Sequence, residues 1–174
     1  MHFALSEKSW ILDEIGPVEF QLLSDIPKAA DPGDSQSAQD RLFPPPIRDA
    51  GSDEAEFLRE WNAYVTDDLI TQFSQDLATF SSDLRRAEVV GKDEDGDPIR
   101  KLEVPISHAQ QWFSSLNQAR LVMGDVHDLY DDDGNVRPRE NEAFSDFHHR
   151  WRIYDRSNFY ALIQEWLISR ILDQ

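Results

Sequence analysis

An acidic run between Asp131 and Glu142 has the residue types and part of the spacing of a calcium-binding loop. Oxygen-bearing side chains stand at its first, third, fifth and twelfth positions, namely Asp131, Asp133, Asn135 and Glu142. Such loops need glycine at position six for a sharp turn, and Val136 occupies that position here. Two arginines also stand where neutral ligands are expected. We therefore interpret residues 131–142 as an acidic loop and predict no metal in it.

The other side chains that commonly hold metals or act as nucleophiles form no motif. The chain has no cysteine, which excludes thiolate metal sites, disulfides and cysteine nucleophiles. No two of its five histidines stand four residues apart, the spacing that would place both rings on one helical face. Its seven glycines form no phosphate-binding loop, dinucleotide fingerprint or nucleophile elbow. We predict no catalytic residues and no cofactor, and we lean against an enzyme.

Arg120 is the polar side chain that stands out on a predicted helix. It lies at helical spacing from Phe113, Leu116 and Met123, and therefore near the apolar stripe rather than opposite it. A partly buried guanidinium needs a partner. We favour an internal brace to a carboxylate, and the alternative is an unpaired arginine in a groove that receives an acidic group of a partner. Asn117 and Gln164 are further candidate polar residues for structure or interaction.

The segment from His148 to Arg156 interleaves cations with aromatic rings. Proteins that bind single-stranded nucleic acid combine these groups for backbone contact and base stacking. Arg150, Trp151 and Arg152 would carry such an interface. The alternative, which we favour, is that these arginines neutralise carboxylates of the same chain.

The formal net charge of −17 restricts the partners of the chain. An acidic surface repels phosphate backbones and anionic lipid headgroups, so nucleic acid is an unfavourable partner and we predict no membrane association. The acidity serves solubility, which we favour, or steers a partner protein that has a basic surface. No segment has the 18 or more continuous apolar residues of a spanning helix, and residues 1–20 lack a secretory signal. We expect a cytoplasmic protein.

The first third of the chain predicts a hairpin, a short helix and a loop. Alternating apolar and polar residues between His2 and Ile15 predict the hairpin. Pro17 is a favoured first residue for a helix that continues through Ile26. Residues 30–51 contain three consecutive prolines, and we predict a flexible, proline-rich surface loop there. The prolines stiffen this connection, which we favour, or dock onto an aromatic groove.

A regular apolar stripe follows Ser52, which can cap the helix that carries it. It predicts one very long helix or two helices broken near Thr66-Asp67. Packing within the chain is the favoured interpretation, and a homodimer seam is the alternative. The apolar residues recur at spacings of three and four: Leu58, Trp61, Val65, Leu69, Phe73, Leu77, Phe80 and Leu84.

The last half of the chain predicts a second hairpin and three helices. Residues 87–90 and 99–104 favour strands on either side of an acidic tip at 91–98. A helix that begins at Ser107 ends in residues 131–135, and a shorter helix covers residues 144–154. Asp155 or Ser157 can cap a final helix from Arg156 onward. This helix has apolar residues around most of its circumference, as a central helix would.

These elements predict one domain, residues 1–174, with a mainly α fold. We expect an all-α or mainly α helical bundle with one or two small β-hairpins. The final helix would lie at the centre, and the helices that begin at Ser52 and Ser107 would pack against it. A chain of 174 residues with 40% hydrophobic residues can bury a core of this kind.

The C-terminal half resembles an uncharacterised bacterial family known only as a domain of unknown function. The resemblance rests on Trp112, the Leu116-Asn117 pair, the Arg120-Leu121-Val122-Met123-Gly124 run, Tyr154 and the Gln164-Glu165-Trp166-Leu167 run. Met123 replaces the leucine that is usual in the family, a change that conserves volume. Members of the family are often encoded beside the ClpS adaptor of the Clp protease. The resemblance therefore implies a link to regulated proteolysis, and it implies no activity.

These observations favour a non-enzymatic protein-interaction or regulatory domain. The acidic surface, the missing active-site motifs and the family resemblance motivate this hypothesis. A few aromatic or arginine anchors would supply the binding energy, and the acidity would steer association with a basic partner. The alternative is a protein that associates with nucleic acid or mimics its acidic backbone.

Overall fold

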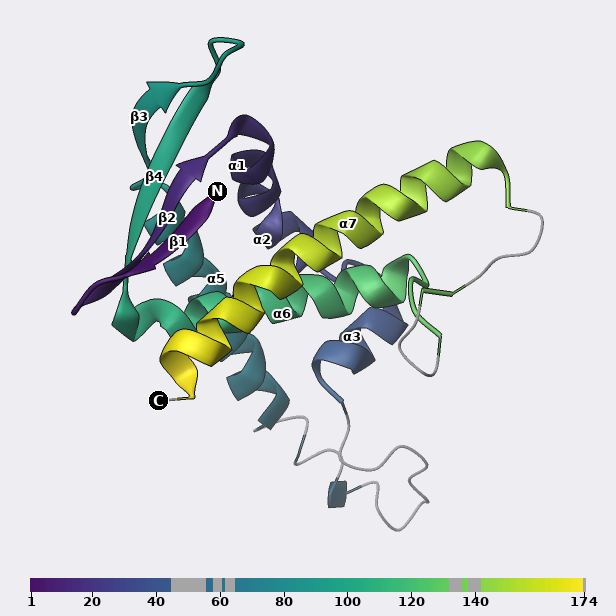
Figure 1. The fold of residues 1–174 in the computed structure, drawn as a ribbon. Coiled ribbons are helices and arrows are strands. Elements are labelled where there is room, and N and C mark those ends of the chain that lie inside the picture. The colour runs from purple at the N-terminus through teal and green to yellow at the C-terminus, as the bar shows by residue number, and fades with distance from the viewer. Residues whose placement is uncertain (45–55, 58–60, 62–64, 132–135, 138–141, 174) are drawn as a thin grey trace.

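The computed structural model describes residues 1–44, 56–57, 61, 65–131, 136–137 and 142–173, in which helices predominate (Figure 1). Two strands and three short helices come first: β1 (His2–Leu5), β2 (Ser9–Ile15), α1 (Pro17–Ser24), α2 (Ile26–Ala29) and α3 (Gln36–Leu42). The long helix α5 (Asp67–Leu84) leads to β3 (Glu88–Lys92) and β4 (Pro98–Pro105). A 3-10 turn (Ile106–His108) precedes α6 (Ala109–Val126), and a π-helical turn (Ile168–Leu172) follows α7 (Phe144–Leu167).

Both predicted hairpins are present, but they join into one sheet. The strand order is β1-β2-β4-β3, and every neighbouring pair is antiparallel. Trp10 lies opposite Val104 and Leu12 opposite Leu102 across the two inner strands, and all four side chains are buried. The prediction of a bundle with separate hairpins therefore needs correction. The fold is mainly α and carries a four-stranded antiparallel sheet, because both inner strands bury the same face against the helices.

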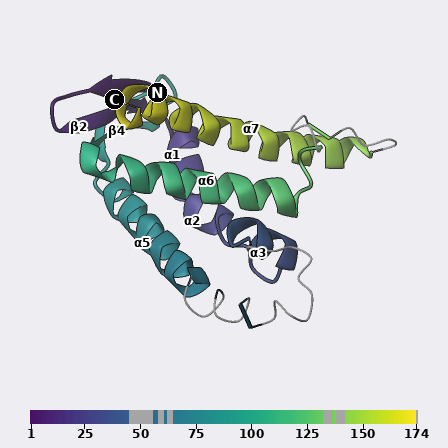
Figure 2. The same cartoon turned by 90° about the horizontal axis from the view of Figure 1, so that it is seen from below.

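Helix α6 is the central helix. It packs against α2, α3, α5 and α7, and it lies between α7 and α5 when the molecule is seen from below (Figure 2). The prediction that the last helix is central is wrong. Helix α7 leaves Phe144 and Leu162 exposed on its outer side, whereas α6 buries Trp112, Leu116 and Ala119.

The predicted ends of three helices also need correction. One continuous helix, α7, replaces the two helices expected on either side of Arg156. Ser157 does not cap a helix, because its hydroxyl forms a 2.8 Å hydrogen bond with the hydroxyl of Tyr130. Helix α6 begins after the 3-10 turn, and no side chain caps it. The prediction that the helix begins at Ser107 is therefore wrong. It ends at Val126, before the acidic run that was expected to terminate it.

Helix α3 lies inside the segment that was predicted as a loop. Its N-cap is Ser35, whose hydroxyl accepts a hydrogen bond from the backbone N–H of Ala38. Ala38 and Leu42 stand one turn apart and pack on Val122 of α6, which forms a small apolar cluster separate from the main core. Residues 45–51 of the predicted loop and the predicted cap Ser52 lie outside the described residues. Within the part that the structure describes, no helix is long and apolar enough to cross a bilayer.

Candidate interaction site

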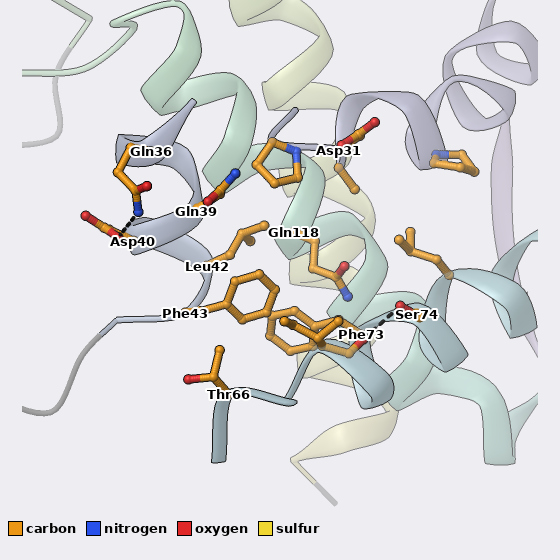
Figure 3. Close-up of a pocket in the computed structure, with 15 residues that line it drawn as sticks. Asp31, Gln36, Gln39, Asp40, Leu42, Phe43, Thr66, Phe73, Ser74 and Gln118 are labelled. Carbon is orange, nitrogen blue, oxygen red and sulfur yellow. Dashed lines mark hydrogen bonds between the residues drawn. The ribbon is translucent and has the colours of Figure 1, made fainter. Parts of the chain in front are cut away.

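A groove of about 840 Å³ lies between α3 and α5. Residues from α2, α6 and the connection between α2 and α3 complete its walls. Figure 3 shows Phe43, at the end of α3, next to Phe73 of α5, and their ring centroids are 5.5 Å apart. Leu42 and Leu77 extend this apolar wall, and Ile70 is 43% exposed beside it. The groove therefore offers an apolar surface that this part of the chain leaves open to solvent.

Carboxylates are the only charged groups among the described residues that line the groove. They belong to Asp31 and Asp40, which are both exposed. Asp40 accepts a 2.8 Å hydrogen bond from the amide of Gln36, and Asp31 accepts one of 2.9 Å from the backbone N–H of Gly33. In Figure 3 both carboxylates point outward from the aromatic pair. The groove thus combines an apolar wall with a negatively charged edge.

A buried carboxylate, Asp76, lies on α5 between the groove residues Phe73 and Leu77. Burial raises its pKa above the usual aspartate range, and a hydrogen bond with Ser114 opposes that rise. Among the described residues, no cation lies within ion-pair distance of this carboxylate. Asp76 therefore carries an electrostatic cost whenever it is ionised in the folded protein.

Arg120 pairs with an amide and not with a carboxylate. Its Nη1 donates a 2.6 Å hydrogen bond to Oε1 of the buried Gln164, whose Nε2 donates to the backbone oxygen of Phe113. No ion pair involves Arg120 in the described part of the chain. The prediction that a carboxylate braces Arg120 is therefore wrong, because its partner is the amide of Gln164. Asn117 joins Arg120 in the wall of a second cavity, of about 610 Å³, so the structure brings three candidate residues together.

The side chain of Arg150 forms an internal ion pair. Its Nε and Nη2 donate to the two carboxylate oxygens of Glu142 at 2.9 and 2.6 Å, and only 7% and 8% of the two side chains are exposed. The hydrogen bond with Glu142 raises the pKa of Arg150 above its ordinary value. Arg156 pairs with Asp25 at 2.8 Å. Both contacts are of the kind expected when arginines neutralise carboxylates of the same chain.

Trp151 and Arg152 lie apart from the other candidates, on the exposed outer side of α7. Trp151 contacts the rings of Phe147 and Tyr154 at 5.7 and 5.3 Å. Arg152 is exposed and forms no ion pair with the described residues. The nucleic-acid interface was expected to use two arginines, Arg150 and Arg152. Of these, Arg150 is paired with Glu142, and Arg152 forms no ion pair with the described residues.

The two acidic loops differ in what can be described. The run at 91–98 forms the exposed tip of the β3–β4 hairpin, as predicted, with Asp93 and Asp97 joined through the backbone. In the other run, Asp133 and Asn135 lie outside the described residues, and Glu142 is held by Arg150. The described residues contain no group of three or more metal-binding side chains.

Sequence reasoning missed most of the groove. Phe73 and Leu77 belonged to the predicted stripe, but α3, which faces them, was expected to be a loop. The available signal was Ser35 followed by Ala38 and Leu42 at helical spacing, a capped amphipathic turn. No local signal identifies Asp31 and Asp40 as edge residues, because many acidic pairs occur in this chain.

The chain matches a family described as "Domain of unknown function (DUF2017)" over residues 10–171. The fold is mainly helical and carries a four-stranded antiparallel sheet. Because the match covers most of the chain, this protein belongs to the DUF2017 family. Neither a curated protein nor a solved structure matches the chain.

Proposed function

We propose that this protein is a non-enzymatic interaction domain whose groove between α3 and α5 binds a basic segment of another protein. The segment would insert one large apolar side chain beside Phe43 and Phe73. Lysine or arginine side chains next to that anchor would reach Asp31 and Asp40.

The composition of the groove is the observation that supports this proposal. Eight of its fifteen described lining residues are apolar, and the only charged ones among these fifteen are two exposed aspartates. Burial of one anchor in such a wall supplies most of the binding energy, and the charged edge selects the partner. The net charge of −17 adds long-range attraction for a basic partner.

The family resemblance supplies a context for the partner. The resemblance implies a gene neighbourhood with the ClpS adaptor of the Clp protease. We therefore propose a cytoplasmic role in regulated proteolysis, with a component of that machinery as the first partner to test. Gene neighbourhood is an association and not a mechanism. The chemistry of the groove adds the requirement that the bound segment carry positive charge beside an apolar residue.

Fluorescence anisotropy with a labelled 12-residue peptide of leucine, lysine and alanine tests this function on the full chain. We expect saturable binding that weakens as salt is raised, and no binding of a peptide in which glutamate replaces lysine. The double variant Asp31→Asn/Asp40→Asn should weaken binding roughly tenfold, since two partly exposed charge contacts are lost.

A matched control distinguishes peptide binding at the groove from attraction to the overall negative charge. The double variant Asp93→Asn/Asp95→Asn removes the same charge from the exposed hairpin tip and should bind like the unmodified chain. Equal weakening in both double variants would show that the lysine peptide senses only the net charge. Failure of the lysine peptide to bind would also contradict the proposal.

A further inference from the structure

Three residues of the sequence motif on α6 line one cavity. Asn117, Arg120 and Gly124 follow one another at spacings of three and four, which places them on the same face of the helix. The cavity has a volume of about 610 Å³ and is completed by Arg41 of α3 and by residues that follow α6. It shares no lining residue with the groove between α3 and α5. It is therefore a separate site.

Arg120 has unused hydrogen-bonding capacity at this cavity. A guanidinium carries five N–H donors, and among the described residues the Arg120 side chain forms one hydrogen bond, to Gln164. Its Nε is buried and has no acceptor in this part of the chain. A partly buried cation without a counter-ion is costly, and it is unexpected in a chain with 34 acidic and 17 basic residues. Arg120 therefore indicates a missing anionic partner.

The other charges of the cavity define which anion fits. Arg41 adds a second guanidinium that has no ion pair with the described residues. Arg137 is already neutralised by Asp128 at 3.2 Å. Asp125 and Asp131 also line the cavity, and Asp125 accepts a 2.8 Å hydrogen bond from Ser37. Their two negative charges balance those of Arg41 and Arg120, and they repel a dianion such as phosphate more strongly than a monoanion.

We propose that this cavity binds a monocarboxylate. The planar guanidinium of Arg120 matches a carboxylate through two parallel hydrogen bonds, and the neighbouring Asn117 amide donates a further one. Gln164 positions Arg120, because it is buried and tied to the backbone of Phe113. Gly124 keeps the wall free of a side chain where the ring of Tyr130 approaches within 3.3 Å of the position of a Cβ.

Titration of the ¹⁵N-labelled full chain with defined carboxylates tests the proposal. The probes are propionate, N-acetyl-alanyl-alanine with a free C-terminus, and the same dipeptide with an amidated C-terminus. We expect saturable shifts of the backbone amides of Leu121 and Gly124 with one or both carboxylates and none with the amidated dipeptide. Propionate binding would identify a free acid as the ligand, and binding of the dipeptide alone would identify a chain terminus. Inorganic phosphate at equal ionic strength should bind more weakly.

Variants connect the shifts to the guanidinium. Arg120→Met should weaken carboxylate binding roughly 10- to 100-fold. Arg120→Lys keeps the positive charge but loses the paired N–H donors of the guanidinium, so it should also weaken binding. Arg85→Met removes an exposed arginine outside the cavity and should bind normally. If Arg120→Met does not fold, Asn117→Ala replaces it, with an expected loss of roughly fivefold. Absent saturation, tighter binding of phosphate, or equal binding by the folded Arg120 and Arg85 variants would overturn the proposal.

Discussion

The indole Nε1 of Trp112 donates a 3.0 Å hydrogen bond to Oδ2 of Asp83, and both side chains are buried. Asp83 also accepts from Arg86 at 2.6 Å and contacts Nδ1 of His108 at 2.9 Å. This carboxylate joins the end of α5 to the start of α6, and α6 lines both candidate sites. Its role is to fix the relative position of two helices.

Asp83→Ala should therefore destabilise the protein by about 2–4 kcal/mol. The substitution leaves the indole N–H of Trp112 buried without an acceptor. Urea unfolding followed by tryptophan fluorescence measures the change. Ser82→Ala, at the neighbouring exposed position, should change stability by less than about 0.5 kcal/mol. An Asp83→Ala protein as stable as the Ser82→Ala protein would show that the carboxylate does not join the helices.

Asp76 should make stability depend on pH in the opposite sense to a salt-bridged carboxylate. Burial raises its folded-state pKa, so its stabilising contribution is full below the unfolded value of 3.8 and is lost as the pH rises through the folded pKa. Asp76→Asn removes that loss and keeps an oxygen that can accept from Ser114. The variant should be more stable than the unmodified chain at pH 7, and the two should converge as the pH falls towards 3.8. Urea unfolding at a series of pH values measures this, and a less stable variant at pH 7 would refute it.

Arg150 and Arg152 stand two residues apart on α7 and should respond differently to alanine. Arg150→Ala leaves the carboxylate of Glu142 buried without its partner and should cost about 3 kcal/mol. Arg152→Ala removes an exposed, unpaired arginine and should stay within about 0.5 kcal/mol. Thermal unfolding of the two variants under identical conditions gives the comparison. Equal loss in both would mean that the ion pair with Glu142 adds nothing to stability.

Local patterns predicted the secondary structure where each element carries its own signal. The two hairpins were predictable because apolar alternation and turn residues are local, and Pro17 correctly marked the start of α1. The joining of the hairpins was not predictable, because the pairing of β2 with β4 links residues about 90 positions apart. Ser157 shows a different limit. Its hydroxyl resembles a helix cap in sequence, but in the fold it bonds to Tyr130 and α7 continues through it.

The candidate sites were predictable only in part. The sequence singled out Asn117 and Arg120 as candidate polar residues, and in the structure both line one cavity. The partner of Arg120 depends on how α7 packs against α6, which no local pattern contains. The groove required α3 to be seen as a helix, and its mostly polar sequence resembles a loop except at Ala38 and Leu42. Sequence reasoning therefore found the polar motif and missed the apolar surface.

Photo-crosslinking inside the host tests the central claim, that the groove binds a basic segment of a partner protein, most directly. Benzoylphenylalanine at Ile70, a partly exposed groove residue, is compared with the same group at Val18, an exposed residue of α1 outside the groove. We predict an adduct at position 70 and not at position 18. The linked peptide should carry lysine or arginine beside an apolar residue, and the adduct should be lost with Asp31→Asn/Asp40→Asn. Equal crosslinking at both positions, or an acidic peptide linked at position 70, would contradict the account.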